Sequence, residues 1–286
     1  MPTDTICFVT TCRGRLAHLK QTLPLLVKQP GASVVVVDYD CPEKAGDWVE
    51  EAYPQVQVVR SGPAGYFELA RARNLGAQAA KATQAPWLCF VDADAVLAPG
   101  FVEAIAPSLR PGHFYIAADS SGSISGMCFC TSADFASVGG YDVVLQGWGM
   151  EDKDLYRRLE LAGVRLQRFP VDGVRMIPHG DDMRVRHYDL KRLQLSSSLN
   201  FVYCRAKWDL MSLGRQMEDE ARRRELYELI GNGLKSAAEG GVPFRLRIPT
   251  STKASVSGAV LSASLMYELG EIPPGRSDPA TRSRPR

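Results

Sequence analysis

Two aspartates one residue apart, Asp92 and Asp94, directly follow the apolar segment 87–91. Two carboxylates at the end of a strand can share one hard cation with phosphate or sugar oxygens, and Mg²⁺ and Mn²⁺ prefer such ligands. By itself the Asp-x-Asp triplet also fits a solvated turn, since it occurs by chance in many acidic loops. Its place after a buried strand and before the Pro99-Gly100 break favours a divalent-cation site.

A second group of residues is the run Gly147-Trp148-Gly149, followed closely by Glu151 and Asp152. The two acids could simply stabilise the start of a helix, because acidic residues are common in a first helical turn. That reading leaves the tryptophan between two glycines unexplained. Its indole offers a flat apolar face to a sugar ring, and a nearby carboxylate could act as a general base toward a hydroxyl group.

Arginine, aspartate and histidine side chains complete the set. Arg13 and Arg15 follow the first apolar segment, and Asp38 follows the second. His179 ends the Met-Ile-Pro-His run that begins at Met176. Neutral imidazole is a common metal ligand, although a lone histidine more often has a structural role. Together these residue types suit a diphosphate, a ribose and a divalent cation.

These side chains need a scaffold that brings distant segments to one edge. Over roughly the first 100 residues, uniformly apolar strands alternate with helical patterns, which predicts a parallel sheet covered on both faces in a Rossmann-like half. The predicted strands are residues 5–11, 33–37, 56–60 and 87–91, and the predicted helices are residues 16–26, 43–52 and 69–82. Ligands bind beyond the carboxyl ends of such strands, so the side chains that follow them should meet there.

The second half of the chain has a mixed pattern. Its predicted strands are residues 115–118, 127–131 and 164–169, and its predicted helices are residues 132–138, 152–161, 191–205 and 208–235. We therefore expect an α/β domain over residues 1–190. Its first half, to about residue 100, would bind a nucleotide-linked donor substrate, and its second half would bind the acceptor of the transferred group. A helical extension over residues 191–269 would pack on this domain, and residues 270–286 would form a disordered tail.

The composition excludes several classes of protein. The 286 residues carry 34 Lys and Arg against 32 Asp and Glu, and this near balance argues against a general nucleic-acid binder. No segment approaches the roughly 18 apolar residues of a membrane span. The N-terminus lacks the pattern of a signal peptide, and seven scattered cysteines do not form a disulfide framework, so we expect a cytoplasmic protein. Arg205, Lys207 and Arg215 allow peripheral membrane contact at most.

The motifs together resemble those of GT-A-fold glycosyltransferases. More narrowly, the chain resembles glycosyltransferase family 2 and the β-1,4-galactosyltransferases with their related chondroitin-polymerase-type domains. The resemblance covers about residues 5–190 and rests on five segments that follow the family's order: Arg-Gly-Arg-x-x-His-Leu at 13–19, Ala-Arg-Asn-x-Gly at 72–76, Phe-Val-Asp-Ala-Asp at 90–94, Gly-Trp-Gly-x-Glu-Asp at 147–152 and Met-Ile-x-His at 176–179.

The resemblance implies inverting transfer of a sugar, with galactose or an N-acetylhexosamine favoured, from a UDP-sugar to a hydroxyl group. Asp152 would be the general base, and Glu151 would orient the acceptor. The residues implied in donor binding are Thr10, Thr11, Arg13, Arg15, Asp38, Arg73, Asp92 and Trp148. Those implied in holding Mn²⁺ or Mg²⁺ are Asp94, His179 and Met176. Because a thioether is a soft ligand, Asp181 or His187 could replace Met176.

The acceptor could be a saccharide, a lipid-linked sugar or a peptide. Two other functions remain open at this point. A sugar-nucleotidyltransferase would need a glycine-rich phosphate loop after the first strand, and residues 10–15 contain one glycine. A non-catalytic nucleotide-sugar-binding protein would have no need of the intact acids Asp92, Asp94, Glu151 and Asp152.

Overall fold

The computed structural model describes residues 5–119, 124, 126–180, 183, 186–189, 193–215, 217–250, 254–256, 259–261 and 263–270. The chain divides into two compact units. The first comprises residues 1–147 and 151–189, and the second comprises residues 148–150 and 190–286. Within the described residues, no helix combines the length and the hydrophobicity needed to cross a bilayer.

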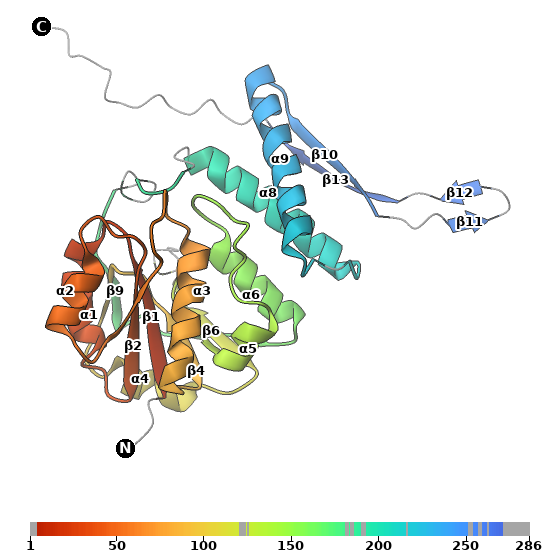
Figure 1. Ribbon diagram of the computed structural model, residues 1–286. Helices are drawn as coiled ribbons and strands as arrows, with labels where there is room; N and C mark the ends of the chain where they lie inside the picture. Colours follow the sequence, from red (N-terminus) through yellow and green to blue (C-terminus); the bar gives the residue numbers. More distant parts are fainter. Residues whose placement is uncertain are drawn as a thin grey trace, which may run out of the picture. The chain divides into compact units, whose positions relative to one another are not determined.

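The first unit is built on a seven-stranded sheet in the order β3-β2-β1-β4-β7-β6-β8 (Figure 1). The strands are β1 (Ile6–Cys12), β2 (Ala32–Asp38), β3 (Gln57–Arg60), β4 (Trp87–Phe90), β6 (His113–Ala117), β7 (Cys128–Thr131) and β8 (Arg165–Phe169). The first four in chain order are parallel, and β7 runs antiparallel to both of its neighbours. The predicted α/β class, with a parallel first half and a mixed second half, is therefore confirmed.

Helices cover both faces of this sheet. They are α1 (Leu16–Leu26), α2 (Ala45–Ala52), α3 (Leu69–Ala80), α4 (Phe101–Ile105), α5 (Ser132–Ser137) and α6 (Glu151–Leu161), with short 3₁₀ turns at Lys81–Thr83 and Ala106–Ser108. Alternate residues of β1 enter two separate hydrophobic clusters, one shared with α1, α2 and α4 and the other with α3, α5 and α6. Burial on both faces explains why these strands are uniformly apolar.

A small antiparallel pair lies beside the main sheet. Residues of β5 (Ala95–Leu97) pair with β9 (Val174–Met176), so that Ala95 lies opposite Met176. The Ile177 backbone N–H also donates to the Asp94 carbonyl oxygen at 2.8 Å. This pairing joins the end of the Asp-x-Asp triplet to the start of the segment that carries His179.

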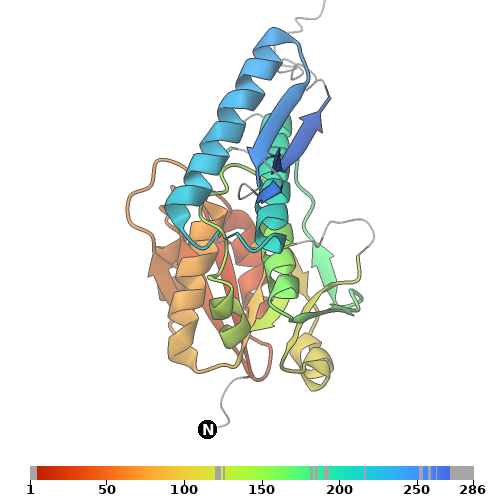
Figure 2. The ribbon, with the colours of Figure 1, turned by 90° about the vertical axis from the view of Figure 1, so that its right-hand side faces the viewer.

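The second unit contains α8 (Leu193–Ser212) and α9 (Glu220–Gly240), and it also contains strands. An antiparallel pair, β10 (Phe244–Pro249) and β13 (Ser264–Leu269), lies along α9 (Figure 2). A shorter pair is formed by β11 (Ala254–Val256) and β12 (Ala259–Leu261). The prediction of a helical extension over residues 191–269 missed these strands.

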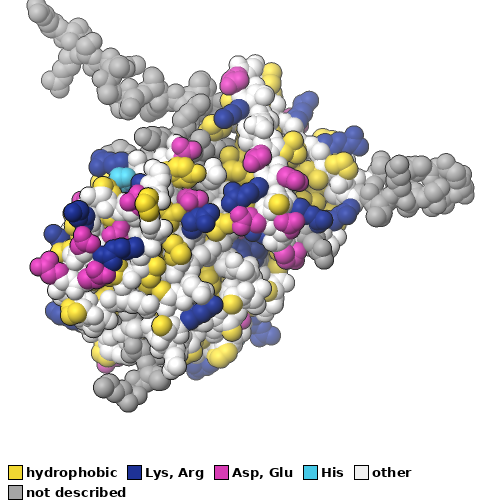
Figure 3. Space-filling model, in the orientation of Figure 1, with side chains coloured by type: hydrophobic (Ala, Val, Ile, Leu, Met, Phe, Trp, Pro, Cys, Tyr) yellow, Lys and Arg dark blue, Asp and Glu magenta, His cyan; other side chains and the backbone are white. Residues whose placement is uncertain are grey.

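The helix limits in the second unit also differ from the prediction. The first helix continues past residue 205, and Gly214 (φ 73°) takes a left-handed conformation just beyond its end. The second helix begins at residue 220 rather than 208, where the Asp219 side chain accepts the Ala221 N–H at 2.9 Å. Of the expected tail, residues 271–286 lie outside the described residues. On the face shown in Figure 3, basic and acidic side chains are interspersed.

Candidate active site

A buried arginine on α3 joins two of the predicted acidic residues. Arg73 donates from Nη2 to Asp92 Oδ1 at 2.8 Å and from Nη1 to Asp152 Oδ1 at 2.5 Å. Its side chain is 3 % exposed, whereas that of Asp92 is 39 % exposed and that of Asp152 is 13 % exposed. The structure thus brings the end of β4 and the start of α6 together, with the arginine behind both carboxylates.

Tyr141 supports the same arginine and was not predicted from the sequence. The Arg73 guanidinium lies over its ring, 5.1 Å from the centroid, and its hydroxyl donates to Asp152 Oδ1 at 3.4 Å. Asn74 holds the Tyr141 backbone from both sides, since it donates to the carbonyl at 2.9 Å and accepts the N–H at 2.8 Å. The Ala-Arg-Asn run on α3 therefore positions both Arg73 and its aromatic neighbour.

Gly126 leaves room for the Arg73–Asp92 pair, and sequence reasoning did not find it. A Cβ at this position would lie 2.6 Å from Asp92 Oδ2 and 2.9 Å from Arg73 Nη2. Any larger residue would have to displace one of these two charged groups. A glycine in a segment without helical or strand pattern carried no signal that could have indicated this role.

Burial shifts the protonation of the two acids that begin α6. It raises the pKa of Asp152 to about 6, against the lowering effect of the Arg73 charge and hydrogen bond. Burial and then the neighbouring Asp152 charge raise the pKa of Glu151 to about 7. A carboxylate whose pKa lies this close to neutrality is suited to take up a proton during a reaction.

The Asp94 and His179 side chains meet, as predicted. His179 Nε2 lies 2.7 Å from Asp94 Oδ2, and both side chains are nearly buried. Burial raises the pKa of Asp94. His18, from α1, has its ring centroid 5.9 Å from that of His179, and its buried Nδ1 has no hydrogen-bond partner among the described residues.

The other candidates for the metal site are not seen to join Asp94 and His179 in the described residues. Met176 lies opposite Ala95 in the β5–β9 pair and packs against the hydrophobic cluster that α1, α2 and α4 share. Asp181 lies outside the described residues. The His187 ring instead covers Gly14, where an added Cβ would lie 2.0 Å from His187 Nε2. In the part of the chain that the structure describes, no three His, Cys, Asp or Glu side chains are grouped as they would be around a metal ion.

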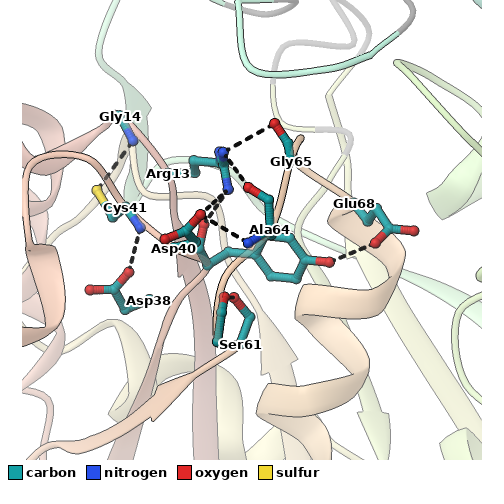
Figure 4. Close-up of polar contacts among 11 residues, drawn as sticks. Arg13, Gly14, Asp38, Asp40, Cys41, Ser61, Ala64, Gly65 and Glu68 are labelled. Carbon is teal, nitrogen blue, oxygen red and sulfur yellow. Dashed lines mark hydrogen bonds and ion pairs between the residues drawn. The ribbon is translucent and has the colours of Figure 1, made fainter.

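The residues predicted to bind the nucleotide organise the loops beyond β1 and β2 (Figure 4). Arg13 donates to the carbonyl oxygens of Tyr39 at 3.1 Å and Ala64 at 2.9 Å, and to Asp40 Oδ2 at 3.4 Å. The Asp38 carboxylate accepts two backbone N–H groups, from Cys41 at 2.7 Å and from Gly46 at 2.6 Å.

Thr10, Thr11 and Arg15 also lie in this region. Both threonines are buried at the end of β1, and the Thr10 hydroxyl has no partner among the described residues. Arg15 donates from Nη2 to the Met183 carbonyl oxygen at 3.1 Å, and within the described chain its buried Nη1 has no acceptor. These are donors that an anion could use.

Trp148 belongs to the second unit, together with the two residues that follow it. Its backbone N–H donates to Ser196 Oγ at 2.8 Å, and Asn200 Nδ2 donates to the Gly149 carbonyl oxygen at 2.9 Å. Both partners are on α8. Gly149 (φ 98°) and Met150 (φ 78°) have the left-handed conformation that lets the chain turn sharply before α6.

Within the first unit, a shallow cleft lies beside Glu151. Its walls include Glu68, Leu145 and the aromatic rings of Phe67 and Tyr188, whose centroids are 5.6 Å apart. The cleft has room for about one water molecule, so in this structure it is smaller than a pocket that encloses a sugar.

Comparison with known families accounts for this arrangement. Residues 7–129 match the glycosyl transferase family 2 model, and residues 109–180 match the model described as the N-terminal domain of galactosyltransferase. The chain contains a family 2, galactosyltransferase-like glycosyltransferase domain. The two matches overlap and together span residues 7–180, which include Arg13, Arg73, Asp94, Asp152 and His179, and the suspected GT-A family is confirmed.

Individual relatives agree with this assignment of the glycosyltransferase domain. Beta-1,4-galactosyltransferase 2 of Cricetulus griseus is 28 % identical over 171 residues, which cover 56 % of this chain and 45 % of that protein. Human chondroitin sulfate synthase 3 is 45 % identical over 47 residues, covering 16 % of this chain and 5 % of that protein. This chain therefore spans less than half the length of the curated relatives it matches.

The fold itself is shared with solved glycosyltransferase structures. A crystal structure of GalNAc-T7 with UDP, GalNAc and Mn²⁺ superposes with a TM-score of 0.55 and 17 % identity. The match covers 80 % of this chain and 55 % of that one. At this identity the similarity establishes the GT-A fold of the glycosyltransferase domain.

Proposed function

We propose that this glycosyltransferase domain transfers a sugar from a UDP-sugar to an acceptor hydroxyl with inversion, and that Asp152 is the general base. The observation that carries the proposal is the buried Arg73, which holds Asp92 and Asp152 on one guanidinium group. Asp92 would face the donor substrate and Asp152 the acceptor. Because one guanidinium group holds both carboxylates, their separation is fixed, which suits a reaction between two bound substrates. The raised pKa of Asp152 supports its role as the proton acceptor.

In this mechanism the acceptor oxygen attacks the anomeric carbon from the face opposite the diphosphate. The bond from the acceptor oxygen to the anomeric carbon forms while the bond from that carbon to the diphosphate oxygen breaks. The leaving diphosphate takes the electron pair, and the acceptor proton passes to an Asp152 carboxylate oxygen. Glu151 orients the acceptor hydroxyl for this attack.

The donor set at Asp94 and His179 fits a divalent cation. A carboxylate oxygen and an imidazole nitrogen suit Mn²⁺ and Mg²⁺, and the buried Asp94 carboxylate already lies against His179. A cation bound there would offset the negative charge that develops on the diphosphate. Met176 as a third ligand stays a prediction.

On the donor side, Arg13, Arg15 and Asp38 would bind the UDP portion, and Asp92 would contact the ribose or the donor sugar. Arg15 Nη1 and the Thr10 hydroxyl support this assignment, because they are donors without partners in the described residues. Trp148 as a donor-binding residue stays a prediction. Galactose or an N-acetylhexosamine is the proposed donor sugar, with a saccharide, lipid-linked or peptide acceptor, and a cytoplasmic location.

A donor screen tests the proposal. We expect UDP-galactose or a UDP-N-acetylhexosamine to raise the melting temperature in the presence of Mn²⁺, and EDTA to remove the effect. Release of UDP with an added saccharide acceptor would then identify the transfer. Pyrophosphate release from a sugar 1-phosphate and UTP would instead indicate a nucleotidyltransferase and contradict the proposal.

The Asp152→Asn variant tests the proposed base. It should bind the UDP-sugar as the wild type does, because Asp152 acts on the acceptor. Its turnover should fall by a factor of about 10² to 10⁴, the usual contribution of a general base. The Asp209→Asn variant in α8 is a control for loss of a carboxylate elsewhere. Full turnover by Asp152→Asn would rule out the assignment.

A further inference from the structure

Cys12 and Cys41 form a close thiol pair at the carboxyl ends of β1 and β2. Their Sγ atoms are 3.9 Å apart, within hydrogen-bond distance for sulfur. Both side chains are buried, Cys12 completely and Cys41 with 7 % exposed. All seven cysteines of the chain are free thiols, so this pair is reduced.

The surroundings make the two thiols unequal. The Gly14 backbone N–H donates to Cys41 Sγ at 3.3 Å (Figure 4). The hydrogen bond from Cys12, followed by bonds from backbone N–H groups including that of Gly14, lowers the pKa of Cys41 to about 6. The same contact raises the pKa of Cys12. The lowered pKa of Cys41 favours its thiolate, the more nucleophilic form of a cysteine, whereas the raised pKa of Cys12 favours its thiol.

The pair is also part of the loop network that holds the proposed nucleotide-binding residues. The Cys41 backbone N–H donates to Asp38 Oδ1 at 2.7 Å. Arg13, next to Cys12, contacts Asp40, next to Cys41. A disulfide bond is about 2.0 Å long. Closing the present Sγ–Sγ separation of 3.9 Å changes the positions of both side chains and the Gly14 N–H contact to Cys41 Sγ, in the loops that also carry Arg13 and Asp38.

We propose that Cys12 and Cys41 are an oxidisable dithiol that a hydroperoxide closes to a disulfide, which weakens nucleotide-sugar binding. The second half of this inference rests on the proposed function, whereas disulfide formation does not. Cys41, with 7 % exposure, is the more accessible of the two thiols to a peroxide, whereas Cys12 is completely buried. A purely structural role as two small buried apolar groups is the alternative that the experiments must separate.

The reaction proceeds in two balanced steps. The Cys41 thiolate attacks one oxygen of hydrogen peroxide, the O–O bond breaks, and the other oxygen leaves as hydroxide, so that Cys41 becomes a sulfenic acid. The Cys12 thiol then gives its proton to the departing hydroxyl group while its sulfur attacks Cys41 Sγ. The S–O bond breaks and water leaves. The two cysteines lose two electrons in total, and the peroxide is reduced to water.

Mass spectrometry of the full chain tests disulfide formation without any variant. After limited peroxide treatment, the intact mass should fall by two hydrogens and return with dithiothreitol. A non-reducing tryptic digest should join residues 1–13 to residues 29–44. Because residues 1–13 also contain Cys7, the Cys7→Ala variant is the matched control and should still form the link. Cys7 belongs to the hydrophobic cluster on the other face of the sheet.

Two results would overturn the dithiol. One is oxygen addition at Cys41 with no link to Cys12. The other is a link that persists in Cys12→Ser or Cys41→Ser, because it would show that other cysteines form it. Neither result depends on whether the protein binds a nucleotide sugar.

UDP binding to the reduced and oxidised full chain tests the functional half. We expect oxidation to raise the Kd for UDP at least about tenfold, and reduction to restore it. Cys41→Ser should bind UDP equally before and after peroxide treatment. Equal affinity of the two wild-type forms would overturn the proposed effect on binding. Failure of the reduced protein to bind any UDP compound would overturn the proposed donor together with this effect, and would leave the mapped disulfide intact.

Discussion

At the scale of single residues, the main result is that one arginine serves two acids. Sequence motifs place Arg73 with the donor and Asp152 with the acceptor. The structure shows both contacts on one buried guanidinium. A planar group with several fixed N–H donors can bind two carboxylates at once, which a lysine ammonium on its flexible stem cannot reproduce.

The Arg73→Lys variant tests this bridge. We expect kcat/KM for sugar transfer to fall on the order of 100-fold, because misplacement of catalytic groups by an ångström has about that cost. Steady-state kinetics with UDP-sugar and acceptor measure the change. Arg71→Lys is the matched control, since Arg71 lies on the same helix and pairs with Glu68 in a half-exposed position. Equal losses in both variants would count against a specific role for the bridge.

The protonation of Asp152 predicts a pH dependence. In the proposed mechanism Asp152 must be deprotonated to accept the acceptor proton, so activity should rise with pH through about 6. Tyr141→Phe removes a hydrogen bond that stabilises the anion. This change should raise the pKa of Asp152, and with it the acid limb of the pH–activity profile, by about 0.5 pH unit. The shift corresponds to the loss of about 0.7 kcal/mol of hydrogen-bond stabilisation of the carboxylate. Tyr267→Phe, which removes a similar bond to Asp209 in the second unit, is the control.

The same two acids should affect stability in the opposite direction. The native pKa values of Asp152 and Glu151, about 6 and 7, lie above their ordinary values of 3.8 and 4.5. Between these limits the folded protein binds more protons than the unfolded chain does. The contribution of the pair to stability therefore decreases as the pH rises from about 4 to about 7.

At the scale of elements, two close contacts position the chemistry. Helix α3 approaches the sheet at Gly76, where an added Cβ would lie 2.3 Å from Val9 Cγ1 and 2.9 Å from Val37 Cγ2. The β5–β9 pairing brings Asp94 to His179. The first contact fixes how closely α3, which carries Arg73, packs on the sheet. The second contact brings together the two proposed cation ligands, Asp94 and His179.

Gly76→Ala should therefore lower both stability and activity. The added methyl group must push α3 away from β1, which costs about 1–3 kcal/mol in a packed core. Urea unfolding measures the loss. Gly231→Ala in α9 is the matched control, because a Cβ at Gly231 would make only ordinary van der Waals contact with Leu199, at 3.7 Å. An alanine there should stabilise the protein by up to about 1 kcal/mol. A neutral Gly76→Ala would contradict the tight fit.

His179→Ala tests the proposed cation site. The Kd for Mn²⁺, measured by calorimetry in the presence of UDP, should rise at least about tenfold. The fold should be retained, because the His179 side chain lies outside the two hydrophobic clusters. His113→Ala removes a histidine at the start of β6 whose Nδ1 lies 3.2 Å from the Pro111 carbonyl oxygen and whose ring lies beside Tyr115, and it should leave the Mn²⁺ affinity unchanged. Unaltered affinity in His179→Ala would refute the assignment.

At the scale of the whole molecule, the parallel half could be predicted because strands buried on both faces are uniformly apolar. The predicted strand 33–37 lies within β2 (Ala32–Asp38), for example. The three-residue strands β5 and β9 are too short to show a pattern. The alternation of Phe244 and Leu246 with arginines does predict a strand in β10, and a helical reading of that region missed it.

Part of the candidate site could be predicted from the sequence, because the predicted order of strands already indicates which residues lie at one edge of the sheet. Residues at strand ends converge because of the sheet topology, so the grouping of Arg13 with Asp40 follows from β1 and β2 lying side by side. The contact of Arg73 with Asp152 depends on how α3 and α6 pack, and no local pattern carries that information. Tyr141 and Gly126 have roles that only the packed structure reveals.

The attachment of Trp148 has a consequence for modularity. The triplet 148–150 lies within the sequence of the first unit but is held by Ser196 and Asn200 of α8. A recombination at residue 190 that exchanged the C-terminal unit would separate the tryptophan from its hydrogen-bond partners. Chimeras that exchange the C-terminal unit should therefore carry residues 148–150 together with the segment that begins at residue 190, because the two segments fold as one unit.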